Sequence, residues 1–231
     1  MRGEGAGADH SGMDQQSVVL ITGASKGLGL SLARAFAKEG HRVVINARDE
    51  GALRRAAATF PIPQNVLAVA GDVSESAEDI AREAIDRFGR VDILINNASE
   101  LGPSPMTKLL DHPWESLLRV FRVNVVAPIH LIQLLRPSTV VNITSDAAVN
   151  AYPGWGGYGA SKAALEHASR ILAKELGDDL QVLVVDPGDM NTEMHAQAEP
   201  GVDLSHLPHP DEVAPRIIRL IEERVSERVV A

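Results

Sequence analysis

The sequence predicts an α/β protein whose parallel sheet is doubly wound and covered by helices on both faces. Short runs of Val, Ile and Leu recur along the chain, each with the length and continuous apolarity of a strand buried on both sides. Segments with helical spacing of apolar residues separate these runs. Such an alternation indicates right-handed crossovers between parallel strands.

The strands and helices alternate in order along the chain. The apolar runs assigned as strands are Val18 to Ile21, Val43 to Ile45, Val66 to Val69, Ile93 to Ile95, Val140 to Ile143 and Val182 to Val185. Three helical segments end at Gly40, Gly89 and Gly177, because glycine suits the left-handed backbone of a helix C-terminus. This order predicts a three-layer αβα arrangement of the Rossmann type, which binds ligands beyond the carboxyl ends of its strands.

The chain is expected to hold one domain, from residue 17 to residue 231, because no internal repeat or linker divides it. Residues 1–16 carry four glycines and no apolar run, so we expect a flexible leader there. Met190 to Pro210 is interrupted by prolines and is expected to form a long irregular loop, a candidate lid.

Composition excludes several classes of protein. The chain has no cysteine, so it forms no disulfide framework and no thiolate metal site, and a cytoplasmic location is the expectation. A net charge of −9 provides no basic field for nucleic acid or for an anionic membrane. No stretch approaches the roughly 18 apolar residues of a membrane-spanning helix. His206 and His209 with Asp203 could suggest a metal, but their loop shows no third strong ligand in register, so no metal site is predicted.

A glycine-rich turn follows the first predicted strand directly. Thr22 to Gly29 reads TGASKGLG and opens a helix, so the backbone can turn tightly and approach a ligand while helix N–H groups face it. Such a turn favours a pyrophosphate. It differs from the phosphate loop of nucleotide hydrolases, because the Gly-Lys-Ser/Thr triplet is missing. Taken alone, the motif is also compatible with a purely structural turn.

A second group of residues can carry acid–base chemistry. Lys162 stands four residues after Tyr158 on a predicted helix, so both side chains project from one face. A nearby ammonium can lower the pKa of a tyrosine by roughly 1 to 3 units from its usual value near 10. Ser145 follows the fifth predicted strand, where its hydroxyl could hold a carbonyl oxygen. The alternative for an isolated Tyr-x-x-x-Lys pair is an ordinary exposed helix face.

Taken together, these motifs resemble the short-chain dehydrogenase/reductase family, and the resemblance spans Val18 to about Pro215. Thr22 to Gly29 is similar to the family's Thr-Gly-x-x-x-Gly-x-Gly cofactor turn. Asn96-Asn97-Ala98 resembles its Asn-Asn-Ala-Gly signature, and Pro187-Gly188 with Thr192 resembles its Pro-Gly-x-x-x-Thr segment. The residues that match its catalytic tetrad are Asn124, Ser145, Tyr158 and Lys162.

The resemblance implies hydride transfer between a nicotinamide cofactor and a carbonyl or alcohol. Tyr158 would act as general acid/base, Ser145 would orient the oxygen, and Lys162 would hold the nicotinamide ribose and depress the tyrosine pKa. The implied cofactor contacts are Gly23, Ser25, Lys26, Gly27, Leu28, Gly29, Arg48, Asp72, Val73, Asn97, Ala98, Tyr158, Lys162, Pro187, Gly188, Met190 and Thr192. Among them, Asp72 resembles the family's adenine contact.

Asn124 and the charges after the second strand carry further expectations. The resemblance implies that Asn124 supports a water of a proton relay; the alternative is a plain helix-bending polar residue. Ala47 stands where NAD-preferring relatives usually have an acid, so nothing there repels a phosphate. Arg48 and Lys26 could converge on the 2′-phosphate of NADP, which predicts NADP(H) over NAD(H). Otherwise the two cations are solvated surface charges.

Two departures from the family pattern stand out. Ser99 replaces the glycine of the Asn-Asn-Ala-Gly signature, and Arg228 to Ala231 end where the family commonly continues through a last strand, which we interpret as a truncated or atypical end. This ending is the one feature that favours an alternative, a non-catalytic NADP-binding regulatory or scaffold protein. The expected partners are a small carbonyl or alcohol and further copies of the chain, as a homodimer or homotetramer. The residues expected near the substrate are Ser99, Glu100, Leu101, Trp155, Met194 and His195.

Overall fold

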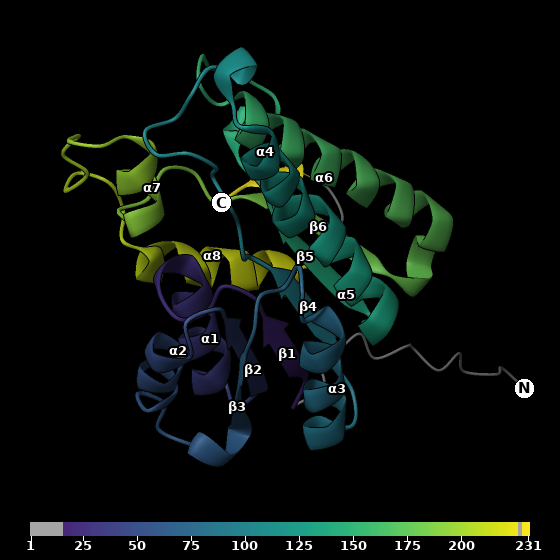
Figure 1. Cartoon of the computed structure of the whole chain (residues 1–231). Helices are drawn as coiled ribbons and strands as arrows, with labels where there is room; N and C mark the ends of the chain where they lie inside the picture. Colours follow the sequence, from purple (N-terminus) through teal and green to yellow (C-terminus); the bar gives the residue numbers. More distant parts are fainter. Residues whose placement is uncertain (1–15, 226–227) are drawn as a thin grey trace, which may run out of the picture.

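A computed structural model describes residues 16–225 and 228–231 and contains a seven-stranded sheet at its centre (Figure 1). The expected leader, residues 1–16, lies outside the described residues except for its last residue. The strands are β1 (Val18–Ile21), β2 (Arg42–Ala47), β3 (Val66–Ala70), β4 (Ile93–Asn96), β5 (Thr139–Ile143), β6 (Gln181–Asp186) and β7 (Arg228–Val230). Their order is β3-β2-β1-β4-β5-β6-β7 and every pair is parallel, which confirms the doubly wound sheet.

Helices cover both faces of the sheet, as the three-layer prediction requires. On one face lie α1 (Gly27–Lys38), α2 (Glu50–Ala57) and α8 (Pro210–Glu222). On the other lie α3 (Ala77–Phe88), α4 (Trp114–Phe121), α5 (Ala127–Leu135) and α6 (Gly156–Leu176). Side chains of β1 alternate between the two apolar cores, because successive residues of a strand point to opposite faces.

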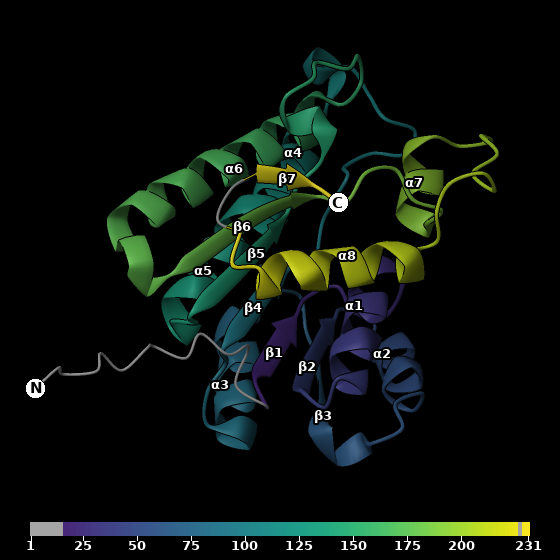
Figure 2. The same ribbon diagram turned by 180° about the vertical axis from the view of Figure 1, so that it is seen from behind.

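The last residues of the chain correct one interpretation. Arg228–Val230 form β7, which pairs with β6 in the register Val184 to Arg228 and Asp186 to Val230. The expectation that Arg228 to Ala231 end without a last strand was therefore wrong, because Arg228–Val230 form a strand beside β6 (Figure 2). The strand has only three residues and begins with an arginine, so it lacked the apolar run that marked the other strands.

Other local expectations are refined by the structure. Gly40 and Gly89 have φ of +94° and +81°, as expected after α1 and α3. Gly177 has φ +53° but ψ −127°, so it begins a tight turn rather than a left-handed helix cap. The segment Met190 to Pro210 is not irregular throughout, because it contains α7 (Glu193–Ala198), whose first turn is capped by the hydroxyl of Thr192.

The helical stretch Trp114–Leu135 is longer than expected. It runs from α4 through a π-helical segment, Arg122–Val126, into α5, and an 18-residue window within it has a mean hydropathy of 1.4. By length and composition it could cross a membrane, so the statement that no stretch approaches this length was wrong. Core helices of soluble proteins meet the same two criteria, and 39% of the window is buried against the rest of the protein.

Candidate active site

The carboxyl ends of β1, β4, β5 and β6 bring the sequence motifs to one edge of the sheet. The turn after β1 contacts the loop after β4: the Asn97 side chain donates to the carbonyls of Thr22 and Gly23 at 2.9 and 3.1 Å. The amides of Asn97 and Ala98 both donate to the Thr22 hydroxyl, at 3.1 and 3.0 Å. Hydrogen bonds therefore hold the glycine-rich turn and the Asn-Asn-Ala loop as one unit.

The glycines of this turn are needed for different reasons. A Cβ at Gly23 would lie 2.8 Å from Cα of Ala98, and one at Gly29 would lie 2.5 Å from Nδ2 of Asn97. These two glycines are required by packing within the protein. Gly27 has φ +56° and its nearest neighbour would be a methyl group of Thr192 at 3.9 Å. Gly27 therefore faces open space at the start of α1, where no side chain caps the helix.

The two cations predicted to bind a phosphate are each paired with a carboxylate. Arg48 lies 3.3 Å from Glu100, and Lys26 is paired with Glu193 of α7. The side chains of Arg48 and Lys26 are 61% and 62% exposed. Exposed pairs of this kind contribute about 0 to 1 kcal/mol, so a competing anion can replace the carboxylates.

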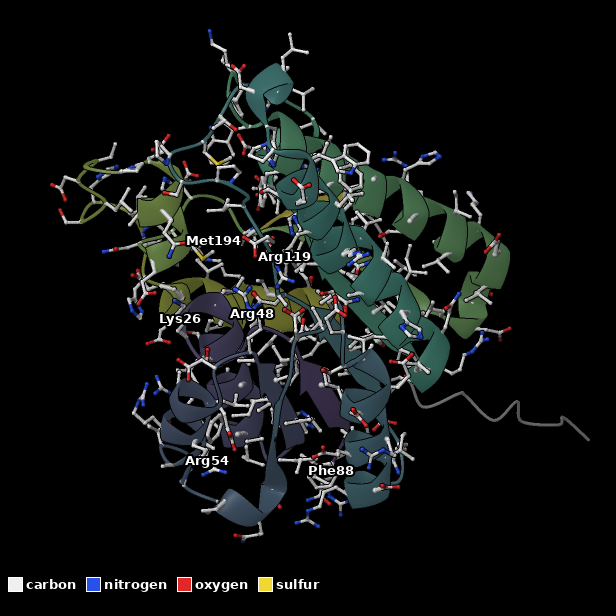
Figure 3. All side chains as sticks on the ribbon, viewed as in Figure 1. Lys26, Arg48, Arg54, Phe88, Arg119 and Met194 are labelled. Carbon is white, nitrogen blue, oxygen red and sulfur yellow. The ribbon has the colours of Figure 1, made fainter. Side chains whose placement is uncertain are left out.

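Asp72, expected to contact adenine, is held by protein groups. Its carboxylate accepts the amide and hydroxyl of Ser74 at 2.9 and 2.7 Å and pairs with Arg119 of α4. Burial raises the pKa of Asp72, but the hydrogen bonds from Arg119 and Ser74 outweigh it and the pKa is lowered. Arg119 also lies 3.6 Å from Glu100, so Arg48, Glu100, Arg119 and Asp72 form a continuous chain of charges. Figure 3 labels Arg48 and Arg119 of this chain.

The structure brings three members of the expected tetrad together. Tyr158 and Lys162 lie on the inner face of α6 and are only 7% and 2% exposed. Ser145 follows β5 and begins a short turn whose Ala147 amide it accepts at 3.2 Å. The side chains of Ser145 and Ser99 lie near the Tyr158 hydroxyl, and both act to lower its pKa. Ser99 is thus a contact of the reactive hydroxyl that the tetrad motif does not contain, although its place after the Asn-Asn-Ala loop suggested a pocket neighbour.

The ionisation of this pair differs from the expectation. Burial raises the pKa of Tyr158 to about 12, and the nearby side chains of Ser99 and Ser145 only partly offset this rise. Burial lowers the pKa of Lys162 to about 8. The ammonium donates to the carbonyl of Ile143 at 2.8 Å and lies 5.5 Å from the tyrosine ring centroid. The expected lowering of the tyrosine pKa by Lys162 is therefore wrong for this structure, because burial dominates.

Asn124 lies in the π-helical segment and makes hydrogen bonds to the groups around the site. Its side chain is 1% exposed, and its carboxamide contacts both the amide and the carbonyl of Glu100, at 2.8 and 2.9 Å. It also contacts the hydroxyls of Ser99 and Ser161 at 3.2 and 2.9 Å. The carboxamide therefore fastens the loop after β4 to α6. The expected role of Asn124 in holding a water stays a prediction.

The segment after β6 completes this edge. Gly188 has φ +69°, a Cβ there would meet no atom within 4 Å, and its amide donates to Asp186 at 3.1 Å. Met190 is buried, whereas Thr192 caps α7. An apolar cluster surrounds Tyr158 and includes three of the expected pocket neighbours, Leu101, Trp155 and Met194. His195 faces Glu199, with the nearest atoms 3.4 Å apart.

The remaining expected cofactor contacts also lie along this edge. Ser25 is half-buried in the turn after β1, Leu28 is buried at the start of α1, Val73 is buried beside Asp72, and Pro187 is buried after β6. Gly27 and Gly188 both leave space that a side chain would fill. Together with the uncapped start of α1, they fit a dinucleotide laid along the carboxyl ends of the strands.

Comparisons with known proteins agree with this geometry. A family model described as short chain dehydrogenase matches residues 17–203. The chain is 31% identical over 218 residues to an uncharacterized oxidoreductase, YciK, of Escherichia coli (strain K12), covering 88% of this chain and 85% of that protein. It is 35% identical over 193 residues to an NADPH-dependent pterin aldehyde reductase of Arabidopsis thaliana, covering 76% of each.

A solved structure gives the same result. A short-chain dehydrogenase from Escherichia coli CFT073, complexed with NADPH, superposes with a TM-score of 0.85 at 27% identity, covering 93% of this chain and 95% of that one. The chain belongs to the short-chain dehydrogenase family.

Proposed function

We propose that this protein is an NADP(H)-dependent oxidoreductase that transfers hydride between the nicotinamide and a carbonyl or alcohol, with Tyr158 as general acid/base. The observation that carries the proposal is that the Ser145 side chain lies near the Tyr158 hydroxyl while the buried Lys162 ammonium lies 5.5 Å from the Tyr158 ring centroid. This arrangement places a transferable proton, a second hydroxyl for orienting a substrate oxygen and a cation in one apolar site.

The roles follow from the contacts. Bound NADP(H) would supply or accept the hydride. Tyr158 would give its proton to the substrate oxygen in reduction and take it back in oxidation, while Ser145 would orient that oxygen. Lys162, which donates to the carbonyl of Ile143, would hold the nicotinamide ribose, and its ammonium beside the ring would favour the phenolate. Trp155, whose ring centroid lies 5.9 Å from that of Tyr158, would help to exclude water.

Charge supports NADP(H) as the preferred cofactor. Arg48 and Lys26 are exposed cations at the ends of β2 and β1, and no acid stands at Ala47. A 2′-phosphate carries more charge than a carboxylate and could displace Glu100 from Arg48. The Arabidopsis reductase is NADPH-dependent and the Escherichia coli structure holds NADPH, which agrees with this preference.

The regulatory alternative loses the feature that motivated it. Its motive was the short C-terminus, but Arg228–Val230 form a strand of the sheet. We also propose a homodimer or homotetramer, because the helical stretch Trp114–Leu135 exposes large apolar side chains. Trp114 is 65% and Val126 is 57% exposed. Light scattering after size exclusion would test this: a monomer would contradict the proposal.

The decisive experiment measures NADPH oxidation by the purified protein against a panel of aldehydes, ketones and diketones. The matched variants are Tyr158→Phe and Tyr152→Phe, since Tyr152 is a partly exposed tyrosine whose hydroxyl bonds Asp146 instead. We expect turnover in the wild type and in Tyr152→Phe, and its loss in Tyr158→Phe. Equal rates in wild type and Tyr158→Phe would refute the assigned role. NADPH binding without reduction of any panel member would favour the regulatory alternative.

A further inference from the structure

The last strand carries an arginine that reaches the catalytic region. Arg228 opens β7 at the edge of the sheet (Figure 2). Its Nε donates to Glu166 of α6 at 3.0 Å, and an Nη donates to Asp186 of β6 at 3.1 Å. The same Nη makes a longer contact, 3.5 Å, with the main-chain oxygen of Ser145. One side chain therefore joins the last strand to β6, to α6 and to the residue after β5 that carries the reactive hydroxyl.

Both carboxylates that Arg228 binds are buried, and each accepts a hydrogen bond from one further residue near the site. Glu166 is 3% exposed and accepts the hydroxyl of Thr144, the residue before Ser145, at 2.7 Å. Asp186 is 5% exposed and accepts the amide of Gly188 at 3.1 Å. Through these carboxylates, Arg228 is linked to the side chain of Thr144 and to the main chain at Gly188.

The two buried carboxylates make the ion pairs of Arg228 important for stability. Removing one partner of a buried ion pair leaves a charge that water cannot solvate, which is far more costly than losing an exposed pair. In the part of the chain that the structure describes, the salt bridges of Glu166 and Asp186 are both with Arg228. The planar fork of arginine can bind two carboxylates and a carbonyl at once, whereas a lysine ammonium acts as a single point charge.

We propose that Arg228 is a positioning residue for the reaction at Tyr158: it holds the main chain of Ser145 and the turn from Asp186 to Gly188, and it neutralises the Asp186 carboxylate. This inference rests on the proposed function, because it concerns the same site. It assigns to the C-terminal strand a part in the active site that none of the sequence motifs indicated.

The charges around Tyr158 explain how Arg228 would act on it. Asp186 of β6 and Asp146 of the turn after β5 both raise the pKa of Tyr158, after the larger effect of burial. Lys162 of α6 is the cation beside the ring. Without Arg228, the charge of Asp186 would be uncompensated and would disfavour the phenolate further. Alcohol oxidation requires the phenolate, so its pH profile should move upward.

Three variants separate charge from geometry. Arg228→Met removes both, and Arg228→Lys keeps the charge but cannot span the three contacts. Arg170→Met is the control, because Arg170 is an exposed arginine of α6 whose side chain contacts His167 at 3.3 Å. Arg228 and Arg170 both line a cavity of about 210 Å³, so the shorter side chains introduce no overlap.

The kinetic test follows NADP⁺ reduction with the alcohol that corresponds to the fastest carbonyl of the panel. Arg228→Met should lower kcat by about 10- to 100-fold with little change in the KM for NADP⁺, because it misplaces reacting groups. The rising limb of its pH profile should move up by about half to one pH unit. In Arg228→Lys the rising limb should return to its wild-type pH, but kcat should stay low. Wild-type kcat and pH profile in Arg228→Met, with only a lower melting temperature, would overturn the inference.

Hydrogen–deuterium exchange tests the same inference without turnover. Peptides that contain Ala147, which donates to Ser145, and Gly188, which donates to Asp186, should exchange faster in Arg228→Met than in wild type. Peptides from β2 should not change, and Arg170→Met should match wild type throughout. Unchanged exchange at Ala147 and Gly188 would refute the role of Arg228. Absence of turnover in the wild type would instead refute the proposed function.

Discussion

Two groups of charges lie along the same edge of the sheet and differ in burial. On the side of β1 and β2, Arg48 pairs with Glu100 and Lys26 pairs with Glu193, and both cations are more than half exposed. On the side of β5, β6 and β7, Lys162 is buried and Arg228 binds two buried carboxylates. An exposed pair contributes about 0 to 1 kcal/mol, but losing one partner of a buried pair costs about 3 to 5 kcal/mol.

This difference suggests a division of labour. The exposed pairs can open at little cost, which suits cations that exchange a carboxylate for the phosphate of an incoming cofactor. The buried groups cannot lose a partner without a large penalty, which suits groups that must keep one geometry during a reaction. Substitutions on the buried side should therefore have large effects on turnover or stability, and those on the exposed side should have moderate effects on affinity.

The largest effect is expected at Tyr158. Tyr158→Phe should lower kcat by about 10²- to 10⁴-fold, because it removes the transferable proton and leaves the ring in its apolar cluster. The affinity for NADPH, measured by calorimetry, should stay within about threefold of wild type. A large loss of NADPH affinity together with kcat would indicate that the hydroxyl supports the fold of the site.

The buried ammonium of Lys162 should make stability depend on pH. Its pKa is about 8 in the folded protein and near 10.4 in an unfolded chain, so the unfolded chain binds more protons between these values. The free energy of unfolding should therefore rise from about pH 8 to about pH 10, by up to about 3 kcal/mol. Lys162 thus destabilises the fold most at and below about pH 8.

Urea denaturation of wild type and Lys162→Met across this range measures the effect. The variant should lack the rise, since methionine has no proton to release. Above about pH 10 the raised pKa of Tyr158 acts with the opposite sign, because the unfolded chain then loses its tyrosine proton first. Parallel curves for the two proteins would show that the ammonium is solvated.

A moderate effect is expected on the exposed side. Arg48→Asp should weaken NADPH binding by about 10- to 100-fold and NADH binding by less than about threefold, because a new carboxylate would face the 2′-phosphate. Arg54→Asp is the control, since Arg54 (Figure 3) is an exposed arginine of α2, and its ion pair is with Glu50. Equal weakening of both cofactors by Arg48→Asp would refute the phosphate assignment.

The smallest effect is expected at Glu100, and in the opposite direction. Glu100→Gln removes the carboxylate that competes for Arg48, while Asn124 still holds the main chain of this residue. NADPH should bind about two- to fivefold more tightly, and NADH binding should not change. Weaker NADPH binding would mean that Glu100 orients Arg48 for the phosphate, and the contrast between the two sides would then be smaller than proposed.

Local sequence patterns predicted most of the strands and the helix that carries the reactive residues. The six apolar runs are strands of the sheet, and Tyr158 and Lys162 share the inner face of α6. The strand β7 was missed, because three residues with an arginine at the start have no periodicity of their own. The π-helical segment at Asn124 was not expected either. Over five residues, the spacing of apolar residues does not distinguish a π-helix from an ordinary α-helix.

The sequence by itself determined the order of strands and helices, the glycine-rich turn and the spacing of the reactive residues, because these depend on neighbours within a few positions. Only the tertiary structure decided which charges are partners: Arg48 with Glu100, Arg119 with Asp72, and Arg228 with Glu166 and Asp186. It also decided that burial raises the pKa of Tyr158, against the local expectation from Lys162. Partners and burial depend on packing between segments far apart in the chain, and the local pattern of residues carries no measure of that distance.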